Sequence, residues 1–216
     1  MIRSLRIRLR RDDGGYTLVE LVVAMSIFSV FVVMFISGII AVSRITTEAR
    51  IDAQTSSAAG IALQRIERSA RYANAVNQPG VVGSRAYVEW RTDAISAPTG
   101  VTTCSQLRYR AEDGTVALRT WRANSDPSTG RWSVVMRDVT GTATAGYPFA
   151  TVTAAVGVSN YQGLTVHLRA GLDEGAGSEA STTIYAKNSS VESPSNAIAA
   201  SGQSVSPVCA GKDYRQ

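Results

Sequence analysis

The sequence contains few of the residues that usually carry catalysis or bind metals. Among 216 residues there is one histidine, His167, and there are two cysteines, Cys104 and Cys209. No Gly-rich phosphate loop, HExxH motif or cysteine pair at zinc-ligand spacing occurs. Alternation over residues 164–169 places His167 on a polar strand face, which predicts a surface position rather than a general base. We therefore expect no enzymatic activity, no catalytic residue, no metal and no cofactor.

Acidic residues give no metal-binding pattern either. Asp173, Glu174 and Glu179 lie in a Gly-rich stretch, but their spacing matches no calcium loop. A solvated loop is the interpretation that this spacing favours.

Charge is scarce and unevenly placed, with charged residues at 18% and a net charge of +5. Most of the basic excess precedes Tyr16, where the charged residues are Arg3, Arg6, Arg8, Arg10, Arg11, Asp12 and Asp13. Such a basic leader is typical of a membrane-topology signal rather than of a nucleic-acid footprint. We expect no direct nucleic-acid partner.

A long apolar run follows this leader. Leu21 to Val42 is 22 residues without a formal charge, and a helix of that length spans about 33 Å, enough to cross a bilayer. The arginines before the run predict an N-terminus in the cytoplasm and an external domain after Arg44. A secretory signal peptide cleaved near Ala41-Val42-Ser43 is the alternative, but this run is longer than most signal cores and starts beside Glu20.

The segment Gly15-Tyr16-Thr17-Leu18-Val19-Glu20 resembles the cleavage and methylation site of type IV prepilins and pseudopilins. In that family a basic leader ends in Gly, and a membrane peptidase cuts after it and N-methylates the new first residue. The resemblance implies cleavage after Gly15, N-methylation of Tyr16 and a Glu at the fifth mature position, Glu20. Phe is usual at the first position, so Tyr16 is a mild departure that keeps the aromatic ring.

The resemblance also implies a role for Glu20 in assembly. Cleavage creates a cationic amine at Tyr16, and in the family the carboxylate is thought to meet the amine of a neighbouring subunit. A charged residue at the membrane is costly and usually functional. The alternative is a carboxylate that reaches for the interface beside its own N-terminus.

Helical periodicity continues beyond the apolar run. One face recurs at steps of three, four and seven residues, and it comprises Ile51, Ala58, Ala62, Ile66, Ala70 and Ala73. These small residues suit close packing on a sheet. The pattern predicts one helix from Tyr16 to about Val76, weakest at Ser37-Gly38 and ended by Asn77-Gln78-Pro79-Gly80.

Beyond Pro79 the period changes to two, as in β-strands. The predicted strands are Tyr87–Arg91, Leu107–Arg110, Val116–Trp121, Trp132–Arg137, Leu164–Arg169 and Thr183–Lys187. The turn Ala111–Gly114 and the longer turn Ser125–Gly130 indicate hairpins and a mainly antiparallel sheet covered by the helix. The order of the strands does not follow from the sequence. Trp90, Trp121 and Trp132 either pack in the core or form a ligand surface with the strand arginines.

The two cysteines form an even count in a domain expected to be external. One disulfide, Cys104–Cys209, is therefore predicted, with two separate buried thiols as the alternative. It would join the sheet domain to a Ser-, Ala- and Pro-rich tail expected to be loop. Two segments, Leu63–Arg68 and Thr182–Asn188, resemble minor pilins of the PilW or pseudopilin-J type.

Together these features predict an α+β pilin-like fold, with one long N-terminal helix packed on a mainly antiparallel β-sheet domain. The expected organisation is leader 1–15, transmembrane half-helix 16–43, external half-helix 44–78, β-domain 79–188 and tail 189–216. The expected function is that of a structural subunit, a minor pilin or pseudopilin, of a type IV pilus-like or type II secretion-like filament. Its expected partners are the prepilin peptidase, other pilin or pseudopilin subunits and the membrane. The alternative is a membrane-anchored or secreted ligand-binding or enzymatic domain.

Overall fold

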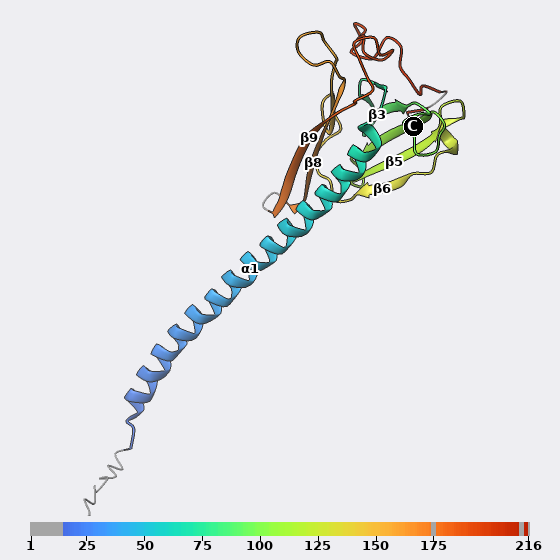
Figure 1. Cartoon of the computed structure of the whole chain (residues 1–216). Coiled ribbons are helices and arrows are strands. Elements are labelled where there is room, and N and C mark those ends of the chain that lie inside the picture. Colours follow the sequence, from blue (N-terminus) through green and yellow to red (C-terminus); the bar gives the residue numbers. More distant parts are fainter. Residues whose placement is uncertain (1–14, 174–175, 212–213, 216) are drawn as a thin grey trace, which may run out of the picture. The chain divides into compact units, whose positions relative to one another are not determined.

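The computed structural model describes residues 15–173, 176–211 and 214–215 (Figure 1). The predicted leader up to residue 14 and Glu174 lie outside the described residues. The chain divides into two compact units, residues 1–47 and residues 48–216. Helix α1 (Leu18–Ala70) contributes its first part to the first unit and the remainder to the second.

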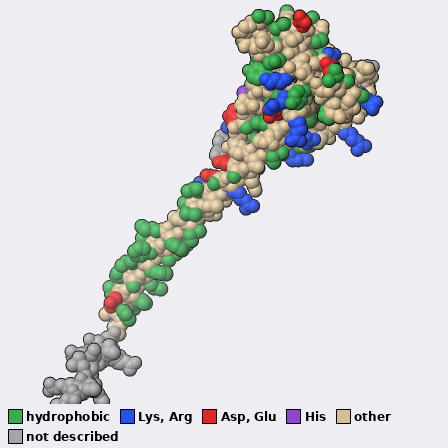
Figure 2. Space-filling model, in the orientation of Figure 1, with side chains coloured by type: hydrophobic (Ala, Val, Ile, Leu, Met, Phe, Trp, Pro, Cys, Tyr) green, Lys and Arg blue, Asp and Glu red, His purple; other side chains and the backbone are tan. Residues whose placement is uncertain are grey.

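In the first unit, α1 is continuous and its apolar side chains are exposed all round the helix. Figure 2 shows them along the face in view. Ser37 and Gly38, the predicted weak point, are both helical. None of the most apolar stretch of α1 is buried. A helix that is apolar all round needs a membrane or other helices around it, and this one is long and apolar enough to span a bilayer.

In the second unit, the predicted apolar face of α1 packs into the core. Ala62, Ile66, Ala70 and, just beyond the helix, Ala73 are buried, as predicted. The prediction was wrong for Ala58, which is exposed, whereas its neighbour Ala59 is fully buried. The step from residue 59 to residue 62 is three, which keeps the stripe on one side of a 3.6-residue helix.

The helix ends at Ala70, earlier than the predicted end at about Val76 and the proposed boundary at residue 78. The residues that follow form a short strand, β1 (Ala75–Val76), which pairs with β3 (Arg85–Thr92). The amides of Asn74 and Asn77 donate to the carbonyls of Arg91 and Glu89. The chain leaves the helical conformation here because the edge of the sheet satisfies the hydrogen bonds of these backbone groups.

The remaining strands are β2 (Gly80–Val82), β4 (Thr103–Arg110), β5 (Thr115–Arg122), β6 (Ser133–Met136), β7 (Phe149–Val152), β8 (Gly163–Asp173) and β9 (Ala176–Tyr185). All six predicted strands are present, whereas β1, β2 and β7 were not predicted. The pairings between these strands are antiparallel. A short 3-10 helix (Pro127–Thr129) occupies the predicted longer turn.

The strands form two sheets, whereas the sequence predicted one. A six-stranded sheet has the order β1-β3-β4-β5-β6, with β2 also paired to β3, and a three-stranded sheet has the order β7-β8-β9. Figure 1 shows the β8–β9 hairpin on one side of α1 and β5–β6 on the other. Residues from both sheets and from α1 share one hydrophobic core, in which Trp90, Leu107 and Leu164 are fully buried.

The C-terminal tail was predicted to be loop, and its described part contains turns and one isolated β-bridge, Ile198–Ser204. It is nevertheless packed against the second unit. Ser189, Ser195 and Val208 are buried, and Val208 exchanges two hydrogen bonds with Asn77. The tail is therefore a structural part of this unit.

Candidate assembly helix and anchored C-terminal segment

The candidate processing site lies at the start of α1. Gly15 and Tyr16 are exposed and precede the helix, whose first residue is Leu18. The Thr17 carbonyl accepts from the Leu21 amide at 3.1 Å, and its hydroxyl accepts from the Glu20 amide at 3.3 Å. Thr17 is thus the N-cap residue, and Glu20 is the third helical residue. The exposed Gly15–Tyr16 bond is accessible to a peptidase.

This geometry gives Glu20 a local function as well. Thr-x-x-Glu is the spacing of a capping box, in which the N-cap hydroxyl accepts a hydrogen bond from the backbone amide of the third helical residue. A carboxylate in the first turn also lies at the positive end of the helix dipole. Sequence reasoning missed Thr17, although the three-residue spacing from Thr17 to Glu20 was sufficient to predict it.

Polar side chains inside the apolar stretch are satisfied within the helix. The hydroxyls of Ser26, Ser29 and Ser37 each donate to a backbone carbonyl three or four residues earlier, at 2.8 Å. Such internal hydrogen bonds remove the need for water. The first part of α1 can therefore lie in hydrocarbon or between other apolar helices.

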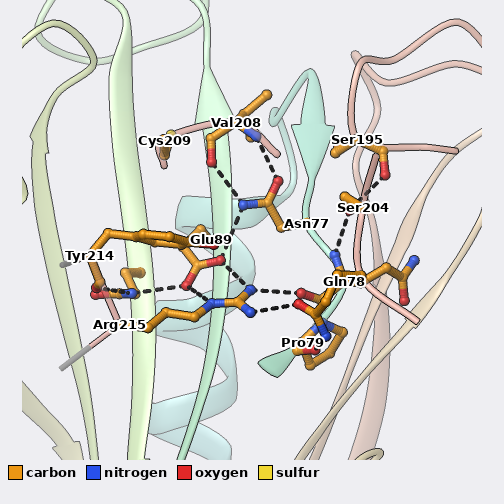
Figure 3. Close-up of polar contacts among 12 residues, drawn as sticks. Asn77, Gln78, Pro79, Glu89, Ser195, Ser204, Val208, Cys209, Tyr214 and Arg215 are labelled. Atoms are coloured by element: carbon orange, nitrogen blue, oxygen red, sulfur yellow. Dashed lines mark hydrogen bonds and ion pairs between the residues drawn. The ribbon is translucent and has the colours of Figure 1, made fainter. Parts of the chain in front are cut away.

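A second polar constellation, in the 48–216 unit, holds the C-terminal segment (Figure 3). Glu89 on β3 is fully buried. Its two carboxylate oxygens accept from Nε and Nη2 of Arg215 at 2.9 and 2.7 Å, and also from Gln106 and Asn77. Burial lowers the pKa of Arg215, but the hydrogen bonds and charge of Glu89 raise it overall. Arg215 therefore stays charged.

The same segment is held across β4 and β5. The Tyr214 carbonyl accepts from Nε2 of Gln106 at 2.7 Å and from Nη2 of Arg119 at 2.8 Å. Glu89, Gln106 and Arg119 occupy paired positions on adjacent strands, so they form one polar row across the sheet. The C-terminal segment lies over this row.

The disulfide Cys104–Cys209 is present, and no described cysteine is free. It joins β4 to the C-terminal segment five residues before Tyr214, which confirms the predicted bridge. Sequence reasoning missed Asn77, Glu89 and Arg215. Nothing in a Ser-rich tail indicates that it covers a strand, so no pattern marked Glu89 as buried.

The three tryptophans and His167, the other residues considered as candidate sites, lie in different parts of the second unit. Trp90 is in the core, whereas Trp121 and Trp132 lie with arginines: the guanidinium carbon of Arg119 is 5.2 Å from the Trp121 ring centroid and 4.6 Å from that of Trp132. His167 pairs with Ser181 between β8 and β9. Within the described part of the chain, no group of three or more His, Cys, Asp or Glu side chains could hold a metal.

Comparison with known proteins places the motif where the residues suggested it. A family model described as the prokaryotic N-terminal methylation motif matches residues 10–36. Neither the curated proteins nor the solved structures give a match. The methylation motif and the apolar helix after it are consistent with a type IV pilin or pseudopilin, and they support a precursor processed by prepilin peptidase. Cleavage after Gly15, methylation of Tyr16 and pairing by Glu20 remain predictions.

Proposed function

We propose that this chain is a structural subunit, a minor pilin or pseudopilin, of a type IV pilus-like or type II secretion-like filament. One observation carries the proposal. The methylation motif at residues 10–36 coincides with an exposed Gly15-Tyr16 bond and the start of a helix that is apolar on all sides. In this role the chain is a substrate of prepilin peptidase and a building block, without catalysis of its own.

The proposed topology places the N-terminus in the cytoplasm, the first part of α1 in the membrane and residues 48–216 outside. The basic leader supports this orientation through the positive-inside rule. The Cys104–Cys209 disulfide supports it independently, because disulfides persist in external compartments and are rare in the cytosol.

For assembly, we propose that the Glu20 carboxylate pairs with the methylated amine of Tyr16 in a neighbouring subunit. The amine is cationic at neutral pH, and both groups would lie among apolar helices where an unpaired charge is costly. Such a pair would fix the axial register of the incoming helix. The competing role is local, since Glu20 is also the third residue of a capped helix.

Two substitutions separate these roles in cells that form the filament. Glu20→Ala removes the carboxylate and should leave cleavage, membrane insertion and external folding intact. The protein should accumulate in membranes and fall at least about tenfold in sheared filaments, which corresponds to 1.4 kcal/mol or more of lost pairing. Thr17→Val removes the capping hydroxyl but keeps Glu20, at a cost of about 1 kcal/mol to the helix start.

Immunoblots of the membrane and sheared fractions measure the outcome. The assembly role predicts that Thr17→Val reaches filaments near the wild-type level while Glu20→Ala does not. Equal loss for both variants would assign Glu20 to helix capping. Wild-type incorporation of Glu20→Ala would refute the assembly role.

A further inference from the structure

The two ends of the Cys104–Cys209 bridge differ in their access to solvent. Cys104 lies on β4 and is 0% exposed, whereas Cys209 in the tail is half-buried. Cys209 also lines a cleft of about 320 Å³ between the tail and the ends of β3 and β5. A thiol reagent that enters this cleft therefore meets Cys209 before Cys104.

An arginine lies on the sheet side of the same cleft. Arg91 lines the cleft and is the residue of β3 directly paired with Cys104. Its Nε donates to the side-chain oxygen of Asn74 at 3.2 Å and lies 3.9 Å from the Asp93 carboxylate. The Asp93 side chain is 52% exposed, so water screens its charge. Arg91 is thus a fixed cation beside the bridge, where a cation stabilises a thiolate.

The surroundings of the two sulfurs favour negative charge on Cys104. Sγ of Cys209 lies 3.5 Å from the carbonyl oxygen of Trp90, whose partial negative charge disfavours a thiolate on Cys209. Directly paired residues on antiparallel strands have Cβ atoms about 4.5–5.5 Å apart, so Arg91 favours a thiolate on Cys104. In thiol–disulfide exchange the leaving sulfur carries the negative charge. Cys104 is therefore the better leaving group, and Cys209 is the better target.

The backbone at Cys209 is strained. Its φ is +60°, a value that residues other than glycine seldom adopt. The bridge holds Cys209 in this conformation next to Val208, which exchanges two hydrogen bonds with Asn77. Breaking the bridge would let Cys209 return to a more favourable conformation, which favours its reaction.

We propose that Cys209 is the exchange-reactive sulfur of the bridge, and that the cleft beside Arg91 admits the thiolate of an external thiol compound or thiol oxidoreductase. The thiolate attacks Sγ of Cys209 and forms a mixed disulfide with it. The Cys104–Cys209 bond breaks, and its electron pair leaves on Cys104. A second thiol then displaces the first from Cys209. In total, two external thiols are oxidised to one disulfide, and the two cysteines take up two electrons and two protons.

The exchange should leave the second unit folded. Beyond Cys209, the tail is still held by the ion pair between Glu89 and Arg215 and by the hydrogen bond from Arg119 to the Tyr214 carbonyl. The proposal depends only on the bridge and the tail, so it is independent of N-terminal processing and of filament assembly.

The test uses the full chain in detergent, with reduced glutathione as the first probe. Acid quenching, denaturation and alkylation with N-ethylmaleimide, followed by mass spectrometry of peptides, locate each adduct. We expect glutathione on Cys209 and maleimide on Cys104, while tryptophan fluorescence stays native. Glutathione on Cys104 instead would overturn the proposal.

A second probe separates the two sources of thiol. A thioredoxin whose resolving cysteine is replaced by serine cannot complete the exchange, so its mixed disulfide with a target accumulates. An adduct of this protein on Cys209 supports an oxidoreductase, and a glutathione adduct alone supports a small thiol. If neither probe reacted until urea unfolded the chain, the native bridge would be inert and the proposal would be wrong.

Variants of Arg91 test the contribution of its charge. Arg91→Met should slow adduct formation at least about threefold, because the leaving thiolate loses its neighbouring cation. Arg91→Lys keeps the charge and should react at nearly the wild-type rate. Arg137→Met, at an exposed position just after β6, is the control and should have no effect. An unchanged or faster rate for Arg91→Met would refute the role of Arg91.

Discussion

Glu89 and Arg215 lie 126 residues apart in the sequence and form a two-pronged buried ion pair. The Glu89 side chain is 0% exposed and that of Arg215 is 11% exposed. Arg215 also donates to the carbonyl of Gln78 and to the side chain of Gln203. One guanidinium thus connects β3, the segment after β1 and the C-terminal tail.

Removing one partner of this pair should destabilise the second unit. Arg215→Met leaves the Glu89 charge buried with only neutral donors, which should cost about 3–5 kcal/mol in the free energy of unfolding. Urea unfolding of the full chain in detergent measures this cost. Tryptophan fluorescence is the readout, because all three tryptophans (Trp90, Trp121 and Trp132) belong to this unit.

Two further variants test the reason for that loss. Glu89→Gln combined with Arg215→Met removes both charges and should recover much of the stability, because no uncompensated charge remains. Arg122→Met, at an exposed position, should change the free energy of unfolding by less than about 0.5 kcal/mol. If Arg215→Met were as harmless as Arg122→Met, the buried-pair interpretation would be wrong.

The disulfide should add to the stability of the same segment. Cys104 and Cys209 are separated by 105 residues, and closing a loop of that size restricts the unfolded chain by about 4–5 kcal/mol in the loop-entropy treatment. Cys104→Ser combined with Cys209→Ser should therefore unfold at a lower urea concentration. Thiol labelling of the unfolded, unreduced chain should find no free cysteine, and two labelled thiols would refute the bridge.

Alkaline pH should destabilise the second unit through Tyr109. Its hydroxyl donates to the backbone carbonyls of Gly141 and Val139, and burial, followed by Tyr147 and Asp113, raises its pKa to about 12. A tyrosine in the unfolded chain ionises near pH 10. Between these values the unfolded chain loses the proton and the folded chain keeps it. Stability is therefore fully present below about pH 10 and falls as the pH rises toward 12.

Tyr109→Phe is the test of this pH dependence. The variant should be less stable at neutral pH by about 1–3 kcal/mol, because the buried carbonyl of Val139 and the part-buried carbonyl of Gly141 lose their donor. Its stability should then fall less steeply than that of the wild type above pH 10. Tyr72→Phe, at a position 51% exposed, controls for loss of a tyrosine hydroxyl. Parallel slopes for wild type and Tyr109→Phe would exclude Tyr109 as the cause.

The features that could be predicted from the sequence are those that depend on residues close together in the chain. The uncharged run of α1, the Gly15-to-Glu20 spacing and the alternation in β3, β4 and β5 each depend on neighbouring residues. The helix face was also predictable as far as Ala70, with an error of one residue at Ala58. The disulfide was predictable because only two cysteines exist.

Most features that could not be predicted depend on contacts between residues far apart in the sequence. The helical pattern predicted a helix to about Val76, but the amides of Asn74 and Asn77 donate to carbonyls of β3, and the segment between them pairs as a strand. Glu89 alternates like an outward-facing strand residue, and it is buried only because Arg215 and Tyr214 cover its row. Division of the strands into two sheets could not be predicted either, because both sheets pair mainly consecutive strands and alternation alone does not show where one sheet ends and the next begins.

We infer that this chain is a pilin-like precursor that is cut after Gly15, two residues before the first residue after the N-cap of α1, Leu18. Mass spectrometry of the N-terminal peptide of the mature protein, isolated from its native cells, tests it most directly. We expect a chain that begins at Tyr16 and carries one N-methyl group. A mature chain that begins near Ser43 or Arg44 would show signal-peptide cleavage instead, and would refute processing as a pilin-like precursor.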